Sequence, residues 1–113
     1  MSSKKDKFNE KDHYYMSLAI NLAKNKKNLT GTNPSVGCVI VKNNRVVTFG
    51  STNINGRPHA ETIALNRNKN NNNGSTLYVS LEPCSHYGKT PPCTNAIIKS
   101  KVKKVIYSIE DND

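Results

Sequence analysis

The chain has 113 residues, a formal net charge of +9 and three cysteines. A chain of this length forms one domain and buries roughly two-thirds of its unfolded surface, so it can fold without disulfide bonds. An odd number of cysteines, in a chain whose polar, lysine-rich start has no signal-peptide pattern, favours reduced thiols or metal ligands over a disulfide framework. We expect a cytoplasmic protein with no membrane anchor.

The positive charge does not by itself indicate a nucleic-acid-binding protein. The lysines are dispersed along the chain, and the sequence has no stretch in which basic and aromatic residues alternate, as in proteins that bind a single strand. Asparagine is as overused as lysine, as in Asn70–Asn73, so one compositional bias explains both residue types. The positive field would still attract a small phosphorylated substrate.

The N-terminal part is predicted to be a flexible basic segment over residues 1–11, followed by one domain over residues 12–113. Apolar residues recur at helical spacing from Tyr15 to Leu22. This periodicity predicts an amphipathic helix from Asp12 to about Asn28, with Asp12 as its N-cap.

A β-hairpin is predicted next. The apolar run Val36–Val41 has the composition of a buried strand, and Arg45–Phe49 returns as its partner. Asn43 and Asn44 supply a two-residue turn between them. Residues 50–58 are predicted to form a loop.

Helices and strands alternate after the hairpin. His59 is predicted to open a second helix, and the asparagine-rich run Asn68–Gly74 ends it as a surface connection. The remaining predicted elements are a strand over Thr76–Leu81, a helix from Pro91 to about Lys99 and a strand over Lys103–Ser108. Together these elements predict an α/β protein, with a mixed sheet in a three-layer α/β/α arrangement.

Four residues near the predicted helix starts have the chemistry of a catalytic zinc site. One imidazole, His59, and two thiols, Cys84 and Cys93, form the ligand set that a catalytic zinc takes when its fourth position is left to water. Two helix N-termini would meet at this point, where their partial positive charge favours thiolates. Zinc lowers the pKa of bound water to about 7. Glu61 is then placed to take that proton and pass it to a leaving nitrogen.

Each part of this pattern has an ordinary explanation when taken alone. An isolated His-x-Glu occurs by chance, and two cysteines with eight residues between them are often buried thiols. The combination is different, because His-x-Glu followed by Pro-Cys and a second Cys is typical of zinc deaminases of nucleobases. The usual two residues between the cysteines are replaced here by eight.

This longer spacing resembles one family. The segments Thr32–Val41, Gly56–Glu61 and Leu77–Cys93 are similar to the deaminase domain of the bifunctional riboflavin-biosynthesis deaminase/reductase, over most of residues 14–110. The resemblance implies a cytidine-deaminase-like fold. It also implies hydrolytic deamination of 2,5-diamino-6-ribosylamino-4(3H)-pyrimidinone 5′-phosphate, with release of ammonia.

The resemblance also implies roles for single residues. His59, Cys84 and Cys93 would be the ligands of Zn2+, and Glu61 would be the proton shuttle. Four further positions match substrate contacts of the family, namely Asn33, His86, Lys89 and Thr90.

The chemistry of these further positions leaves alternatives open. Lys89 offers a cation to a phosphate from a glycine-containing loop beside the metal, or is a solvated lysine. His86 donates to a substrate oxygen or lies on the surface. Asn33, held extended by Pro34, presents its amide to a base edge or forms a turn. Cys38, in contrast, is predicted to be a small core residue and not a ligand.

Two features depart from the family pattern. Related domains carry a histidine seven residues before the zinc histidine, where this chain has Thr52. A hydroxyl cannot be cationic, so a phosphate contact there would be weaker or supplied elsewhere. The chain also stops at Asp113, and we expect it to lack the family's last strand and helix and the reductase domain, which leaves a sheet edge uncovered.

Other functions share part of this pattern. A deaminase of a free nucleotide or of tRNA adenosine would use His59, Glu61 and Cys84 but expects the short Cys-x2-Cys. A structural zinc site in an RNA-binding module would need a fourth protein ligand, for which His86 is available. A shortened, inactive remnant is the third alternative. The resemblance further implies a homo-oligomer, and a reductase partner supplied separately or absent.

Overall fold

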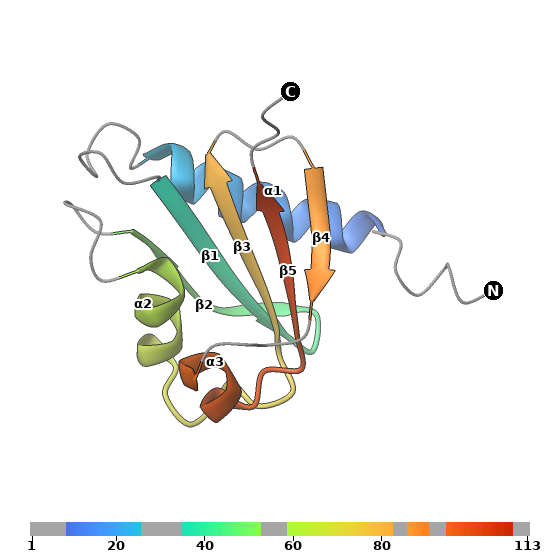
Figure 1. Cartoon of the computed structure of the whole chain (residues 1–113). Coiled ribbons are helices and arrows are strands. Elements are labelled where there is room, and N and C mark those ends of the chain that lie inside the picture. The colour runs from blue at the N-terminus through green and yellow to red at the C-terminus, as the bar shows by residue number, and fades with distance from the viewer. Residues whose placement is uncertain (1–8, 26–34, 53–58, 83–85, 91–94, 110–113) are drawn as a thin grey trace.

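The computed structural model describes residues 9–25, 35–52, 59–82, 86–90 and 95–109. The elements in chain order are α1 (Glu10–Asn25), β1 (Ser35–Lys42), β2 (Arg45–Ser51), α2 (Ala60–Arg67), β3 (Thr76–Glu82), β4 (His86–Thr90), α3 (Asn95–Ser100) and β5 (Lys104–Ile109). They form a three-layer α/β/α domain around one sheet (Figure 1), which confirms the predicted fold class.

The sheet is mixed and has the strand order β2-β1-β3-β5-β4. Strand β1 pairs antiparallel with β2 and with β3, β3 pairs parallel with β5, and β4 pairs antiparallel with β5. Asn43 and Asn44 have φ angles of 55° and 62°, which matches the primed turn that joins β1 to β2. Helix α3 lies on the crossover from β3 to β5.

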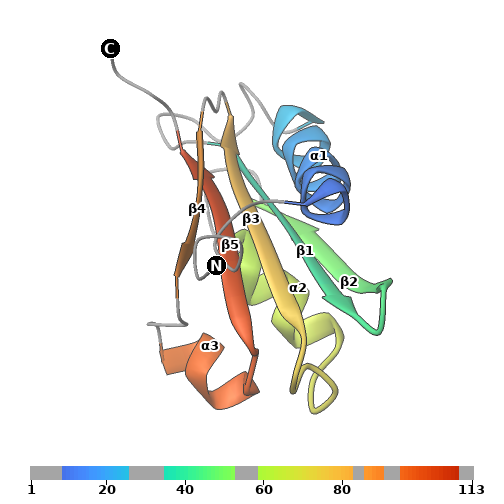
Figure 2. The same cartoon turned by 90° about the vertical axis from the view of Figure 1, so that its right-hand side faces the viewer.

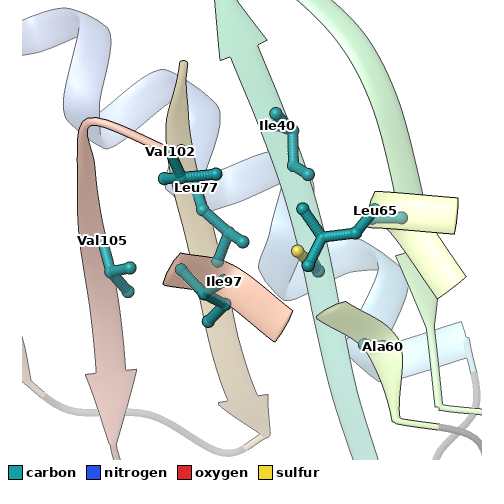
Figure 3. Close-up of a cluster of buried hydrophobic side chains, with 9 residues drawn as sticks. Ile40, Ala60, Leu65, Leu77, Ile97, Val102 and Val105 are labelled. Carbon is teal, nitrogen blue, oxygen red and sulfur yellow. The ribbon is translucent and has the colours of Figure 1, made fainter. Parts of the chain in front are cut away.

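The helices cover both faces of the sheet. Helix α1 packs on one face, and α2 and α3 pack on the other (Figures 1 and 2). The first face buries α1 against β1, β3 and β5 through residues such as Met16, Val39 and Ile106. The second face buries a cluster around Ile40, Ala60, Leu65, Leu77, Ile97, Val102 and Val105 (Figure 3).

Two glycines allow the helices to approach the sheet closely. A Cβ on Gly37 of β1 would lie 2.0 Å from the Ala19 carbonyl oxygen of α1, and one on Gly50 of β2 would lie 2.7 Å from the Ala60 carbonyl oxygen of α2. Because Gly50 pairs with Cys38, next to Gly37, these two contacts lie on neighbouring strands. The glycine at position 50 therefore sets the position of the first turn of α2.

The predicted start of the first helix, with Asp12 as its N-cap, needs correction. Helix α1 begins at Glu10 and not at Asp12. The Asp12 N–H donates to Asn9 Oδ1 at 2.8 Å and the Asn9 N–H donates to Asp12 Oδ2 at 3.3 Å. This is a capping box in which Asn9 is the cap and Asp12 is its third-position partner. Residues 26–28, the expected end of this helix, lie outside the described residues.

The asparagine-rich connection is more than a surface loop. Asn72 is buried, and its side-chain N–H donates to the Leu65 carbonyl oxygen at 3.1 Å, near the end of α2. Its Oδ1 accepts a hydrogen bond from Asn68 at 3.0 Å. Asn72 therefore gives the Leu65 carbonyl a second hydrogen bond, beside the one at 3.3 Å from the backbone N–H of Asn68 at the C-cap of α2.

The sheet has a fifth strand that was not expected. Residues His86–Thr90 form β4, which pairs with β5 at one edge of the sheet. The expectation that Lys89 lies in a loop is therefore wrong. The other four strands agree with the prediction to within two residues at each end, and α3 overlaps the predicted third helix, whose residues 91–94 lie outside the described part of the chain.

Candidate functional site

Three strand ends meet at one end of the sheet. Ser35 at the start of β1 pairs with Glu82 at the end of β3. Thr52, directly after β2, donates its N–H to the Val36 carbonyl oxygen at 2.9 Å. The chain positions expected to form the site follow or precede these ends closely, with Asn33 two residues before Ser35, His59 seven after Thr52 and Cys84 two after Glu82.

Helix α2 carries two of the expected residues. His59 is its N-cap residue, with extended φ and ψ angles of −69° and 155°, and its carbonyl oxygen accepts the first helical hydrogen bond from Ile63 at 3.1 Å. The imidazole is exposed and makes no capping hydrogen bond. The imidazole therefore lies at the positive N-terminal end of α2, and because it makes no capping hydrogen bond, its nitrogens remain available to bind a metal ion.

Glu61 is partly buried in the first turn of the same helix. The pKa of Cys38 in β1 is raised well above its usual range, first by burial of the thiol and then by the negative charge of Glu61. Glu61 therefore lies close enough to Cys38 for its charge to act on that thiol. A carboxylate at this position is stabilised by the helix N-terminus. The first turn of α2 thus carries a carboxylate two residues after an imidazole.

Cys38 itself is a core residue, as predicted. Its side chain is fully buried on the face covered by α2 and α3, and it belongs to the cluster that includes Ile40 and Leu77. A buried thiol with a raised pKa is neutral at neutral pH, so it does not supply the thiolate that a metal takes.

Thr52 is occupied by the backbone. Only 3% of the residue is exposed, and its Oγ1 accepts the Val36 N–H at 3.2 Å and donates to the Val36 carbonyl oxygen at 3.3 Å. The hydroxyl that stands where related domains carry a histidine therefore faces β1. Composition and spacing gave no indication of this role, because it depends on the pairing of two strands.

Three expected site residues, Asn33, Cys84 and Cys93, lie outside the described residues. Within the described ranges no group of three histidine, cysteine, aspartate or glutamate side chains could hold a metal ion. The same ranges contain no helix that is long and apolar enough to span a membrane.

The expected substrate residues of β4 are spread along a strand. His86 pairs with Ile109 at the end of the sheet where β3 finishes, whereas Thr90 pairs with Val105, which in turn pairs with Leu77 near the start of β3. Four residues of extended chain cover about 13 Å. The structure therefore brings the backbone of His86 to the candidate site and places that of Lys89 and Thr90 farther along the edge.

A cavity of about 630 Å³ lies between α2 and α3, at the other end of α2. Its walls include Lys69, Lys99 and Lys101, which follow or end the two helices. Cations are expected at helix C-termini, where they offset the negative end of the dipole. The cavity thus lies at the opposite end of α2 from His59.

The sequence of this domain matches a known protein family. Residues 9–109 match the family model described as the cytidine and deoxycytidylate deaminase zinc-binding region. The riboflavin biosynthesis protein RibD of Aquifex aeolicus is 49% identical over 102 residues, which are 90% of this chain and 29% of that protein. The diaminohydroxyphosphoribosylamino-pyrimidine deaminase of Buchnera aphidicola subsp. Schizaphis graminum is 50% identical over 101 residues, 89% of this chain and 69% of that protein.

Solved structures give the same result. A RibD structure from Acinetobacter baumannii superposes with a TM-score of 0.71 at 49% sequence identity, over 85% of this chain and 27% of that one. A diaminohydroxyphosphoribosylaminopyrimidine deaminase/5-amino-6-(5-phosphoribosylamino)uracil reductase from Thermotoga maritima superposes with a TM-score of 0.67 at 40% identity, over 89% of this chain and 31% of that one. The chain thus spans less than a third of the length of several proteins that it matches, and about two-thirds of the Buchnera deaminase.

Proposed function

Since the chain belongs to the family defined by the cytidine and deoxycytidylate deaminase zinc-binding region, we propose that it catalyses a zinc-dependent hydrolytic deamination. The substrate we propose is 2,5-diamino-6-ribosylamino-4(3H)-pyrimidinone 5′-phosphate, which would yield 5-amino-6-ribosylaminouracil 5′-phosphate and ammonia. Its support is the 50% identity to a relative named as the corresponding deaminase, of which the chain covers 69%.

The observation that carries the proposal is the first turn of α2. His59 stands at its N-cap with an imidazole that takes no part in capping, and Glu61 lies two residues later, partly buried. We propose His59, Cys84 and Cys93 as the zinc ligands. One imidazole and two thiolates suit zinc, and the third cysteine, Cys38, is excluded by its burial.

Glu61 is the proposed proton shuttle. When bound, the zinc ion supplies the Lewis acidity that makes water a nucleophile near neutral pH. Glu61 takes one proton from the attacking water as oxygen adds to C2 of the pyrimidine. It delivers that proton to the ring nitrogen beside C2 and then carries the remaining hydroxyl proton to the amino nitrogen. The exocyclic C–N bond breaks, and ammonia leaves while the ring carbonyl forms.

The remaining proposed residues bind the substrate. Asn33, His86, Lys89 and Thr90 contribute an amide, an imidazole, a cation and a hydroxyl, which suit the base edge, ribose and phosphate of such a nucleotide. His86 has the most direct support, since its backbone lies at the end of the sheet where β3 finishes. We also propose that the protein acts with a reductase, since the name of the Thermotoga maritima relative joins the deaminase and reductase activities. A cytoplasmic location and a homo-oligomer complete the proposal.

The test is turnover by the zinc-loaded 113-residue protein, with mass-spectrometric detection of the deaminated pyrimidine. Glu61→Gln should retain zinc and lose activity by roughly a hundred- to ten-thousand-fold. His59→Ala should lose the metal. Glu10→Gln is the matched control, because Glu10 lies in the first turn of α1, away from the site, and this variant should behave as wild type.

Two outcomes would overturn the proposal. One is a wild-type protein that releases no ammonia from the ribosylaminopyrimidine phosphate, and the other is Glu61→Gln that turns over as fast as wild type. Cytidine, CMP and a tRNA anticodon stem are assayed in parallel. Preferential turnover of one of these would assign the chain to a different deaminase.

A further inference from the structure

The cavity of about 630 Å³ between α2 and α3 has a basic lining. Lys69 follows α2, Lys99 lies in the last turn of α3, and Lys101 comes directly after α3. Asparagine supplies four more of the lining residues, and none of the described residues in the walls is an aspartate or a glutamate. A volume of about 300–1,000 Å³ is usual for the site of a small ligand. The described walls therefore present ammonium and amide groups to an anion, and no carboxylate that would repel it.

Offsetting the helix dipoles does not account for three lysines. The C-terminus of a helix carries about half a negative charge, so three ammonium groups beside two helix ends leave a net charge of about +2. The carbonyls of these ends also accept hydrogen bonds from other groups. The Leu65 carbonyl oxygen accepts from Asn72 at 3.1 Å, and the Ile97 carbonyl oxygen accepts from Ser100 Oγ at 2.6 Å. The lysines are thus in excess of what the two helix ends require.

Lys101 adopts a backbone conformation that lysine does not favour. Its φ is 62°, in the left-handed region. Helices commonly place glycine at such a position after their last turn, because a Cβ atom is unfavourable there. Among the described residues, the other non-glycine residues with a positive φ are all asparagine, which tolerates this region. Backbone geometry therefore does not favour lysine at position 101, and the property that lysine adds there is its ammonium group.

The two chain segments that carry these lysines are joined to each other. The Gly74 N–H, in the segment after α2, donates to the Lys101 carbonyl oxygen at 2.8 Å. Lys42 Nζ, at the end of β1, donates to Asn73 Oδ1 at 3.3 Å and so brings a fourth ammonium group to a wall of the cavity. The backbone on both sides of the cavity is therefore held at a fixed spacing without a ligand.

The lining favours phosphate groups over nucleobases. Lysine ammonium and asparagine amide groups both donate to phosphoryl oxygens. Sites that hold a single nucleic-acid strand add aromatic side chains, on which the bases stack. None of the described residues in the walls is aromatic. A ligand of this cavity would therefore be recognised through its phosphate charge.

We propose that the cavity binds a small polyphosphate, an anion with at least two linked phosphate groups, through Lys69, Lys99 and Lys101. Linked phosphates match a cavity that has lysines on the α2 side and on the α3 side. The cavity lies at the end of α2 away from His59, so this site is separate from the candidate metal centre and does not depend on the proposed deaminase activity.

The test is titration calorimetry of inorganic tripolyphosphate with the zinc-loaded 113-residue protein. Because the three lysines are exposed, we choose a low ionic strength of about 0.05 M. Lys69→Gln/Lys101→Asn removes one charge from each side and should weaken binding by about tenfold or more, the factor of a charge-assisted hydrogen bond. Lys11→Gln/Lys24→Gln is the matched control. It removes the same charge from α1, on the opposite face of the sheet, and should change the affinity by less than about twofold.

Two further measurements locate the site and separate it from a structural role of the lysines. Tripolyphosphate should shift NMR amide signals in residues 69–73 and 99–103 and leave residues 59–61 unshifted. Lys101→Asn alone should bind tripolyphosphate severalfold more weakly, while its urea midpoint stays equal to that of wild type or rises. A lower midpoint with unchanged affinity would assign Lys101 to helix stability and overturn the proposal.

Other outcomes would also overturn it. They are equal weakening in the two double variants, shifts confined to residues 59–61, orthophosphate binding as tightly as tripolyphosphate, and no binding by wild type. Tighter binding of a single-stranded oligonucleotide, with the same dependence on Lys69 and Lys101, would assign the cavity to nucleic acid instead. None of these results involves deaminase turnover, so failure here leaves the proposed function untouched.

Discussion

Asparagine carries several distinct backbone tasks in this chain. Asn43, Asn44 and Asn70 adopt left-handed conformations with φ angles of 55°, 62° and 72°. Asparagine tolerates this region better than other residues that have a Cβ atom. Asn9 caps α1 and Asn72 caps the end of α2. The abundance of asparagine is a matter of composition. At these five positions, however, asparagine either forms a capping hydrogen bond or adopts a left-handed backbone conformation.

These single-residue roles were only partly predictable. The turn at Asn43 and Asn44 follows from two apolar runs that flank a pair of turn formers. Asn72 stands in a run of four asparagines, Asn70–Asn73, and nothing in the sequence distinguishes the buried one. Likewise, Asp12 has the chemistry of a cap, but its true partner, Asn9, precedes the apolar periodicity from which the helix was predicted.

Tyr78 links β3 to α1 and gives a prediction for alkaline pH. Its hydroxyl donates to Asp12 Oδ1 at 2.7 Å inside the protein. Burial, and then the hydrogen bond and charge of Asp12, raise the pKa of Tyr78 above its usual value of about 10. Because the native state holds this proton more tightly than the unfolded chain, the stabilisation is complete below pH 10 and is lost as pH rises above it.

We therefore expect Tyr78→Phe to lose less unfolding free energy than wild type between pH 8 and about 10.5, as measured by urea titration. At pH 8 the variant should be less stable by about 1–3 kcal/mol, since the buried Asp12 loses this donor. Tyr14→Phe is the control, because the Tyr14 side chain is 60% exposed. An equal alkaline loss in Tyr78→Phe and wild type would contradict the prediction.

At the scale of helices and strands, some strands were predictable from the local sequence and one was not. Val36–Val41 and Thr76–Leu81 were predictable because apolar β-branched residues dominate them. Strand β4 was not, since its sequence His-Tyr-Gly-Lys-Thr contains a glycine and no apolar alternation. It becomes a strand by pairing with β5, a tertiary effect that local sequence does not encode.

The contact between α1 and β1 predicts a large effect of one methyl group. In Gly37→Ala the new Cβ would meet the Ala19 carbonyl oxygen at 2.0 Å and the Ala23 nitrogen at 2.8 Å, both backbone atoms that cannot rotate away. We expect a loss of at least about 1–3 kcal/mol in unfolding free energy by urea titration, the usual cost of overpacking.

Gly74→Ala is the contrasting variant. Gly74 has a φ of 76°, but a Cβ there would meet nothing within 4 Å. Only backbone strain is added, so the cost should be about 1 kcal/mol. If Gly37→Ala were no more destabilising than Gly74→Ala, the inference that α1 approaches β1 too closely for a side chain at position 37 would be wrong.

At the scale of the whole molecule, the sheet arranges the candidate site. The sequence predicted that His59 and Cys84 approach each other because two helix N-termini converge outside the strand ends. In the structure, the pairing of Ser35 with Glu82 and of Val36 with Thr52 brings the ends of β2 and β3 to the start of β1. The distribution of Lys89 and Thr90 along β4 was not predictable, because a short glycine-containing segment between two cysteines resembles a loop.

The net charge of +9 predicts a dependence on salt. A positive field raises the local concentration of a phosphorylated substrate, and ions screen it. We expect KM for the ribosylaminopyrimidine phosphate to rise severalfold between about 0.02 and 0.2 M ionic strength. The dephosphorylated compound is the control, and its KM should stay constant. Equal salt dependence for both compounds would show that the field does not act on the phosphate.

The hairpin of β1 and β2, with its two-residue turn, has a consequence for the order of folding. Each strand carries the glycine that receives one helix, and both helices, α1 and α2, adjoin the hairpin in the chain. The pairs α1–β1, β1–β2 and β2–α2 each join elements that are neighbours in the chain, so we expect them to form before the contacts of β3 and β5. During synthesis these elements can assemble while β3 and β5 are still being made, so the histidine side of the site precedes the cysteine side in time.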